Sequence, residues 1–250
     1  MRRRDLIIAT CAVAAVIALP RLAALRDPGF SFQPIPGLEG FRRIDGGGFS
    51  RTSDVFAGLV PAAPQQQDLR DWAARNPCIA AFGPEGWTED KLPVAVFTDY
   101  NCPFCPRLSD MVISLADAGL PIRPVWHDLP VLGQRSEAAA RVAVAAARQG
   151  QYLPVHAYLM RTVLRPGPEP VAALAARFGM DAARLLRDAQ GESVERQLAE
   201  TKAIAAVLGI VGTPAVLVGR TLAIGEIDRS DLERLIDLER STPFAGCHPA

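Results

Sequence analysis

Two cysteines, Cys102 and Cys105, are the residues of this chain best placed for covalent chemistry, because only two residues separate them. The apolar run at residues 94–97 predicts a strand directly before them, and we expect a helix over about residues 103–118. The first N–H groups of a helix lack partners within it and favour negative charge. They would stabilise a thiolate at Cys102, and Pro103 suits the first helical position because it has no N–H. Cys105 would lie on the same face, within reach of a disulfide.

This spacing predicts the redox chemistry of a dithiol. A thiolate is the form of cysteine that attacks disulfides, and its pKa falls at helix N-termini and in Cys-x-x-Cys motifs. We therefore expect Cys102 to be the nucleophile and Cys105 the resolving thiol. A zinc site and a purely structural disulfide are the alternatives. A zinc site needs about four ligands, and Cys11, Cys78 and Cys247 stand alone in the sequence. A disulfide across two residues would be strained and readily reduced, which would itself indicate redox use. We expect neither a metal nor a cofactor.

Length and charge exclude several classes of protein. The chain has 250 residues, which is enough for one domain with an insertion or for two small domains. Its 27 basic and 27 acidic side chains balance, so no basic excess indicates binding to nucleic acid. No segment recurs at a fixed period, which excludes a repeat architecture.

Residues 1–26 predict a signal peptide or an N-terminal membrane anchor. Arginines at positions 2–4 precede an uncharged apolar run over residues 6–19, which is the order found in export signals. Pro20 interrupts the run before it reaches the length that spans a bilayer, although residues 22–25 extend it. The expected location is the periplasm, either as a soluble protein or anchored to the inner membrane.

Export changes the interpretation of the remaining cysteines, because disulfides persist outside the cytosol. Cys78 and Cys247 become candidates for a structural disulfide that ties the C-terminal tail, residues 241–250, to the segment before the motif. Two free buried thiols, or pairing with another chain, are the alternatives, since sequence alone does not give connectivity.

The rest of the chain predicts a split α/β domain. Residues 27–77 are rich in Pro, Gly and Gln and indicate an extension or linker with one short helix at residues 68–75. A C-terminal helix is expected at residues 230–240. Strands are expected at residues 78–82, 94–98, 122–126, 215–218 and 221–224. Five helical segments in a row cannot be crossovers between adjacent strands, so they predict an inserted domain: residues 136–148, 152–164, 171–178, 181–189 and 194–208.

Three stretches carry a resemblance to a known family: residues 97–105, residues 129–133 with 138–150 and His156, and residues 208–214. They resemble the DsbA-like family of exported thiol:disulfide oxidoreductases, over about residues 90–240. The resemblance implies an α/β, thioredoxin-like fold with an inserted all-helical domain. The thioredoxin-like domain would comprise residues 78–133 and 209–240, and the helical insertion residues 134–208.

The resemblance also implies a substrate site. Thr213 and Pro214 match the family's cis-proline turn, which brings the backbone of Thr213 beside the disulfide. Its N–H and C=O would pair with an extended substrate peptide while Cys102 attacks. Phe104 is a further substrate-binding candidate. It departs from the most oxidising members, which carry histidine there, so the resemblance implies a less extreme oxidant.

Three polar residues are open to two interpretations. Asp99 is a candidate proton relay to Cys105 if it is buried beneath the motif, and a turn or capping carboxylate is the alternative. We interpret His127 and His156 as hydrogen-bonded packing residues rather than as catalytic bases or metal ligands.

The predicted function is disulfide exchange with protein or peptide thiols and disulfides. The leading hypothesis is a disulfide donor that a membrane redox partner recycles. A reductase or isomerase for a narrow client set, such as cytochrome or copper-site assembly, is the second. A carrier that holds Cu(I) between two thiolates is the third, and the peptide-docking turn argues against it.

Overall fold

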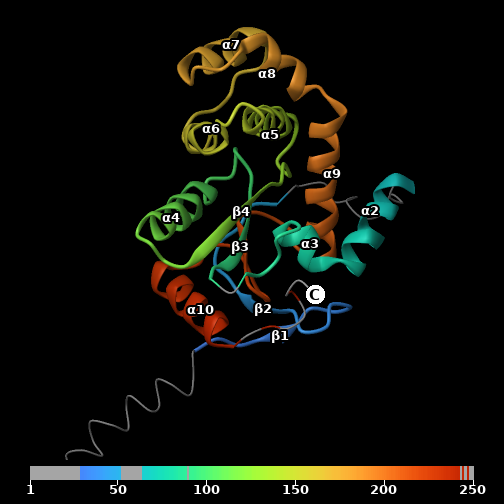
Figure 1. The fold of residues 1–250 in the computed structure, drawn as a ribbon, viewed down its shortest axis with the longest axis vertical. Coiled ribbons are helices and arrows are strands. Elements are labelled where there is room, and N and C mark those ends of the chain that lie inside the picture. Colours follow the sequence, from blue (N-terminus) through green and yellow to red (C-terminus); the bar gives the residue numbers. More distant parts are fainter. Residues whose placement is uncertain (1–28, 52–63, 89, 243, 245–246, 248–250) are drawn as a thin grey trace, which may run out of the picture. The chain divides into compact units, whose positions relative to one another are not determined.

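The computed structural model describes residues 29–51, 64–88, 90–242, 244 and 247 (Figure 1). The chain divides into two compact units, Met1–Ser31 and Phe32–Ala250, and the fold below is that of the second unit. The expected signal or anchor, residues 1–26, lies outside the described residues. Within the described part of the chain, no helix is long and apolar enough to cross a membrane.

A six-stranded sheet in the order β1-β2-β6-β5-β3-β4 forms the centre of this unit. The strand β3 lies parallel to β4 and antiparallel to β5, and β2 lies parallel to β6. The strands are β1 (Gln33–Pro34), β2 (Arg42–Asp45), β3 (Leu92–Thr98), β4 (Ile122–Asp128), β5 (Ala215–Val218) and β6 (Thr221–Ile224).

The strand β3 lies in the interior because its sequence is almost wholly apolar. All seven of its residues are buried, as expected for a strand with neighbours at both edges and helices on both faces. Near its end, Phe97 pairs with His127 of β4 and with Ala215 of β5. The ends of three strands therefore meet just before the two cysteines.

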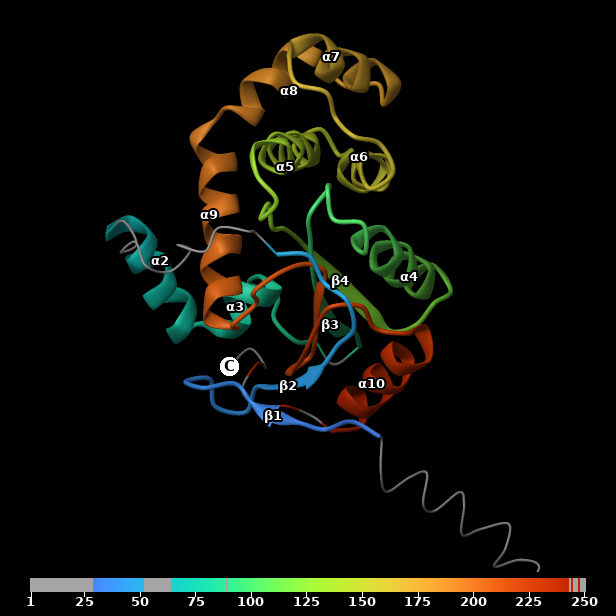
Figure 2. The same cartoon turned by 180° about the vertical axis from the view of Figure 1, so that it is seen from behind.

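Helices cover both faces of the sheet. In the two opposite views, α4 (Cys105–Asp117) and α10 (Arg229–Ser241) lie on one side, and α3 (Pro77–Phe82) and α9 (Glu192–Val207) lie on the other (Figures 1 and 2). The buried face of α4 includes Leu108, Val112 and Leu115, the residues whose spacing predicts an amphipathic helix.

Five consecutive helices form an insertion between β4 and β5, as predicted. The α/β fold with an all-helical insertion is thereby confirmed. The small residues of α5, among them Ala143, Ala145 and Ala146, are fully buried and let neighbouring helices approach closely. The helices are α5 (Gln134–Ala147), α6 (Tyr152–Leu159), α7 (Pro168–Arg177), α8 (Ala182–Ala189) and α9.

Residues 78–82, predicted as a strand, form the helix α3 instead. A short apolar run cannot be assigned to helix or strand by periodicity alone. Here Pro77 occupies the first helical turn, where its missing N–H costs nothing, and Ala80 and Ala81 favour helix.

Residues 33–34 and 42–45, predicted to belong to an extension or linker, form two strands of the sheet. All four residues of β2 pair with residues of β6. Four apolar side chains of this region are buried and offset its Gly and Pro content: Ile35, Leu38, Phe41 and Ile44. Further along the expected linker, the helix α2 (Pro64–Arg75) confirms the short helix predicted at residues 68–75 and begins four residues earlier.

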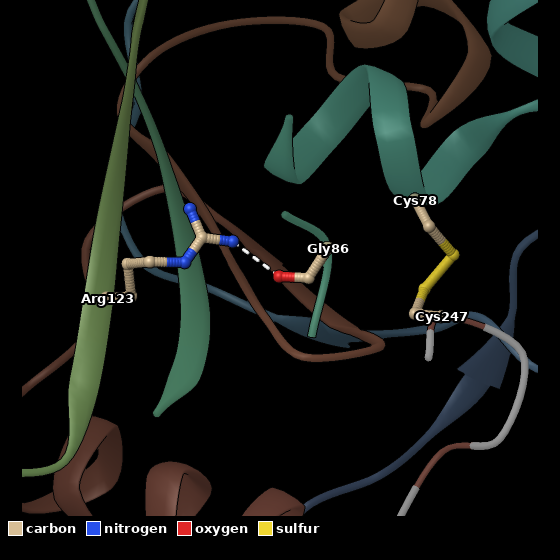
Figure 3. Close-up of a disulfide and its surroundings, with 4 residues drawn as sticks. All are labelled: Cys78, Gly86, Arg123 and Cys247. Carbon is tan, nitrogen blue, oxygen red and sulfur yellow. Dashed lines mark hydrogen bonds between the residues drawn. A yellow bond between two sulfur atoms is a disulfide. The ribbon is translucent and has the colours of Figure 1, made fainter. Parts of the chain in front are cut away.

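A disulfide joins Cys78 in α3 to Cys247 near the C-terminus (Figure 3). Of the three arrangements that the sequence left open, this is the structural pairing within the chain. The two cysteines are 169 residues apart, so the cross-link closes a long loop and restricts the unfolded chain. Arg123 of β4 donates hydrogen bonds to the carbonyls of Phe82 and Gly86 and holds the end of α3 against the sheet.

Candidate active site

Cys102 and Cys105 lie where β3 gives way to α4. The helix begins at Cys105, with Phe104 directly before it and Pro106 in its first turn, so the predicted start at Pro103 is wrong. Pro106 has the same fixed φ and missing N–H that favoured Pro103, and the helix begins beside it. Cys102 therefore lies in the turn ahead of the helix rather than directly before its first residue.

The two sulfurs are buried and are bound mainly by backbone groups. Cys102 is 3% exposed and Cys105 is fully buried, and both are free thiols in this structure. The Cys102 Sγ lies 3.2 Å from the carbonyl oxygen of Thr213. The backbone N–H of Asp99 donates to the Cys105 Sγ over 3.4 Å. The dithiol is thus enclosed between the motif loop and the turn at Thr213.

The surroundings separate the pKa values of the two thiols. A hydrogen bond from Cys105 is the main cause that lowers the pKa of Cys102 to about 6, against the opposing effect of burial. The side chain of Thr213, the backbone N–H of Phe104 and the hydroxyl of Ser50 also lower it. Burial raises the pKa of Cys105 strongly, and its hydrogen bond to Cys102 raises it further. At neutral pH, Cys102 is a thiolate and Cys105 is a thiol, which is the polarity that a nucleophile and a resolving thiol require.

The Thr213–Pro214 peptide bond is cis, and Thr213 is fully buried. Both backbone hydrogen-bonding groups of Thr213 are already in use. Its N–H donates to the carbonyl of Ser50 over 2.8 Å, and the N–H of Ser50 donates to its carbonyl over 2.8 Å, which makes an antiparallel bridge. The edge expected to receive a substrate peptide is therefore occupied by a segment of the same chain.

A family model described as DSBA-like thioredoxin domain matches residues 93–237. The chain belongs to this family. The match contains the two cysteines, the cis-proline turn and the whole helical insertion. The fold and the dithiol of DSBA-like domains are those of thiol:disulfide oxidoreductases.

Solved structures support the same assignment. The crystal structure of a thioredoxin-like oxidoreductase from Silicibacter pomeroyi DSS-3 is 34% identical, with a TM-score of 0.60 and coverage of 66% of this chain and 98% of that one. The catalytic domain of Proteus mirabilis ScsC is 22% identical, with a TM-score of 0.59 and coverage of 69% and 99%. At that lower identity the likeness is one of fold.

Among curated proteins, the similarity extends to a larger kind of protein. The Na(+)/H(+) antiporter NhaA 3 of Salinispora tropica is 26% identical over 162 residues, which are 64% of this chain. The chain spans only 22% of the length of the curated relatives it matches.

Asp99 holds the loops of this DSBA-like domain together. Its Oδ1 accepts hydrogen bonds from the N–H of Asn101 and the hydroxyl of Ser136, and its Oδ2 accepts from the N–H groups of Val131 and Leu132. These four bonds join the motif loop to the segment that enters α5. The bonds agree with the turn or capping interpretation, and the burial of the carboxylate meets the condition set for a proton relay to Cys105, which stays a prediction.

A second polar cluster, centred on Asp128 at the end of β4, lies beside the motif. Tyr100 and Tyr152 both donate hydrogen bonds to Asp128 Oδ1, over 2.6 and 3.1 Å. The Tyr100 hydroxyl also lies 3.0 Å from His156 Nδ1, and His156 Nε2 lies 3.1 Å from the Ser109 hydroxyl. We call these five residues the Asp128 cluster; it connects the sheet, α4 and the helical insertion.

Burial removes charge from the Asp128 cluster. It raises the pKa of Asp128 to about 7, although the two tyrosine hydrogen bonds oppose the shift and Asp99 adds to it. Burial also lowers the pKa of His156 to about 4. The cluster is therefore largely neutral at pH 6, and His156 packs through its hydrogen bonds, as expected from the sequence.

His127 lies on β4, away from the cysteines. Its ring stacks on Phe97 with 4.5 Å between centroids, and its Nε2 lies 2.8 Å from the carbonyl oxygen of Ala81. Burial lowers its pKa. These contacts agree with the packing interpretation.

Asp128 and Ser50 are among the contributors to the site that the sequence did not indicate. Asp128 carries no motif, and only its place at the end of a buried strand signals it. Ser50 follows a run of three glycines that indicates a linker, so nothing in its neighbourhood points to the cysteines. Among the described residues, no group of three or more His, Cys, Asp or Glu side chains is placed to hold a metal ion.

Proposed function

We propose that this protein is an exported thiol:disulfide oxidoreductase that introduces disulfides into protein substrates through Cys102 and Cys105. The observation that carries the proposal is the difference in pKa between the two thiols. One sulfur is held as a thiolate and its neighbour as a thiol, beside a cis-proline turn. Structural and metal-binding cysteines have no need of this asymmetry.

The donor reaction proceeds in two exchanges. The oxidised pair starts as a Cys102–Cys105 disulfide, and a substrate thiolate attacks the Cys102 sulfur. The new bond joins substrate to Cys102, and Cys105 leaves as a thiolate that takes up a proton. A second substrate thiolate then attacks the substrate sulfur of this mixed disulfide and releases Cys102 as a thiolate. The substrate loses two electrons, and the protein dithiol gains them.

The low pKa of Cys102 favours this direction. Hydrogen bonds that stabilise the thiolate stabilise the reduced pair, and a stable reduced form makes its disulfide a stronger oxidant. Phe104 brings no positive charge to the motif, so the protein is a milder oxidant than family members with histidine there. A donor must be reoxidised, so we propose a membrane redox partner in the periplasm, with residues 1–26 as the export signal or anchor.

A reductase or isomerase for few clients is the second candidate. Restricted access favours it, because Cys102 is only 3% exposed and the Thr213 edge is taken by Ser50. The Cu(I) carrier fits less well. It requires both sulfurs as thiolates, and Cys105 holds its proton.

Two serine variants of the full chain test the exchange mechanism. With a reduced model protein as substrate, Cys102→Ser is expected to abolish disulfide formation. Cys105→Ser is expected to accumulate mixed disulfides between Cys102 and the substrate, visible as heavier species on non-reducing gels. Exchange at the wild-type rate by the Cys102→Ser protein would show that the proposed mechanism is wrong.

A further inference from the structure

Residues 46–50, here called the strap, run from the end of β2 to the cis-proline turn. They continue the blue trace that leaves β2 in Figure 2. The strap starts from a fixed strand, because Arg42 of β2 donates to the fully buried Glu239 of α10 over 2.7 Å. Four backbone hydrogen bonds hold it. Two join Gly47 and Gly48 to Glu226, over 2.8 and 2.9 Å, and two join Ser50 to Thr213.

Glycines allow the strap to lie this close to the domain. A Cβ at Gly46 would lie 2.0 Å from the carbonyl oxygen of Ile224, and one at Gly225 would lie 2.4 Å from the carbonyl oxygen of Gly47. A Cβ at Gly212 would lie 2.3 Å from the carbonyl oxygen of Ser50. Real Cβ atoms do not come this close to backbone atoms, so the strap and the surface beneath it can lie together only because these three residues are glycines.

The strap covers the groups that a client would need. Cys102 is 3% exposed, and its sulfur lies 3.2 Å from the carbonyl oxygen of Thr213, the same oxygen that the N–H of Ser50 binds. A client strand that paired with Thr213 would use the N–H and C=O that Ser50 now uses. Strap and client therefore exclude each other at this edge.

The strap also has the chemistry of a client. Serine differs from cysteine only in its γ atom, so Ser50 resembles a client cysteine at the position that pairs with Thr213. The preceding residue, Phe49, is 39% exposed and lies over Gly212, since a Cβ there would be 2.7 Å from the Phe49 ring. The strap thus resembles an extended segment with an aromatic residue before its cysteine.

We propose that the strap is a built-in substrate mimic, and that an extended client segment with an apolar residue before its cysteine displaces it from Thr213 before exchange. This proposal rests on the proposed function. Only molecules whose strap is displaced can bind a client, so docking of the strap lowers the apparent affinity for clients. Clients that pair less well than the strap are rejected, and this narrows the client set.

A cross-linking experiment tests the seating of the strap. In the full chain with Cys105→Ala, the variant Ser50→Cys is treated with oxidised glutathione, which takes up the two electrons and leaves as two reduced molecules. We expect a disulfide between position 50 and Cys102 in most molecules, identified by peptide mass spectrometry. The matched control is Phe49→Cys, whose side chain points to the other face of an extended segment and is expected to yield only glutathione adducts. Equal cross-linking from both positions would overturn the proposed seating.

A pair of glycine variants tests displacement. Gly46→Ala places a methyl group against the Ile224 carbonyl and is expected to release the strap while leaving Thr213 and both cysteines unchanged. The matched control, Gly48→Ala, adds the same methyl at 3.4 Å from the Phe104 ring, which is an ordinary contact. We expect Cys102 in the Gly46→Ala protein to react with iodoacetamide about tenfold faster at pH 8, and its KM for a cysteine-containing peptide to fall by a similar factor. Tenfold corresponds to about 1.4 kcal/mol, close to the net value of one backbone hydrogen bond.

The two readouts separate the two proposals. Alkylation requires no enzymatic activity, so faster alkylation without peptide exchange in any variant would support the strap and overturn the proposed function. Exchange and alkylation at equal rates in wild type, Gly46→Ala and Gly48→Ala would overturn the strap proposal and leave the proposed function standing.

Discussion

The buried sulfur of Cys102 keeps its negative charge. In the Asp128 cluster, which begins two residues away at Tyr100, burial instead favours the neutral forms of the Asp128 carboxyl group and the His156 imidazole. Donors explain the difference. The Cys105 thiol, the side chains of Thr213 and Ser50 and the backbone N–H of Phe104 all lower the pKa of Cys102, and together they outweigh burial. Asp128 receives two tyrosine hydroxyls, and burial still prevails. Burial alone therefore does not decide which groups are charged; the hydrogen bonds to the charged form do.

The largest effect is expected at Asp99, whose carboxylate accepts four hydrogen bonds around the motif. Asp99→Ala leaves those donors without their acceptor, and each buried orphan costs roughly 1–3 kcal/mol. We expect a loss of about 4 kcal/mol in the free energy of unfolding, measured by urea denaturation. Asp99→Asn keeps one acceptor oxygen and should lose about half as much. A loss below about 1 kcal/mol in the alanine variant would contradict this role.

The next effect concerns the donor to Cys102. Cys105→Ala removes the hydrogen bond that contributes most to the low pKa of Cys102. The pKa should rise from about 6 toward the ordinary thiol value of about 8.5, measured as the pH dependence of iodoacetamide alkylation. The matched variant Cys105→Ser retains a donor hydroxyl and should stay nearer to wild type. A pKa of Cys102 that stays at about 6 in Cys105→Ala would show that the Cys105 donor is unimportant.

The Asp128 cluster makes a prediction for stability against pH. The pKa of Asp128 is raised to about 7 in the folded state, so its contribution is complete below its unfolded pKa of about 3.9 and is lost as pH rises through 7. The pKa of His156 is lowered to about 4, so its contribution is complete above its unfolded pKa of about 6.5 and is lost as pH falls through 4. Between about pH 4 and 6.5, the contribution of Asp128 to the free energy of unfolding falls as pH rises and that of His156 rises, so the two changes oppose each other.

Asp128→Asn should remove only the contribution to the free energy of unfolding that falls as pH rises. Its free energy of unfolding should then rise with pH between about 4 and 6.5, by at most about 1.4 kcal/mol per pH unit, where the wild type is nearly flat. Urea denaturation at four pH values across this range is the measurement. Parallel curves for the two proteins would show that Asp128 titrates normally.

The smallest effect is expected at Ser50. Its hydroxyl is the last of the named contributors to the low pKa of Cys102. Ser50→Ala should raise that pKa by less than Cys105→Ala does. The variant keeps the backbone bonds to Thr213, so the peptide KM should not change. A rise as large as that of Cys105→Ala would reverse the ranking of donors around the sulfur.

Local sequence patterns predicted the parts of this molecule that have strong periodicity or special residues. The strands at residues 215–218 and 221–224, the five inserted helices and the helix after the cysteines follow from apolar spacing and proline positions. Cys102 and Cys105 could be paired because they are neighbours in the sequence. The pairing of Cys78 with Cys247 could only be one of three alternatives, since their distance depends on the whole fold.

Long-range backbone contacts were out of reach for the same reason. The sequence around β2 resembles a linker because glycine and proline dominate it. Its burial comes from four scattered apolar side chains and from pairing with β6, about 180 residues later. The contact of Ser50 with Thr213 likewise depends on absent side chains at Gly46, Gly212 and Gly225. Glycine has no side chain, so it adds nothing to the periodic patterns from which the close approach of two backbone segments could be predicted.

The reduction potential of the Cys102/Cys105 pair tests the central claim most directly, because it reports how far the surroundings stabilise the thiolate. The full chain is equilibrated with glutathione buffers, and the fraction of reduced peptide containing both cysteines is quantified by differential alkylation and mass spectrometry. A stabilised thiolate and a disulfide donor predict a potential clearly above the value of about −270 mV for thioredoxin. A potential at or below that value would contradict the account and identify the pair as a reductant.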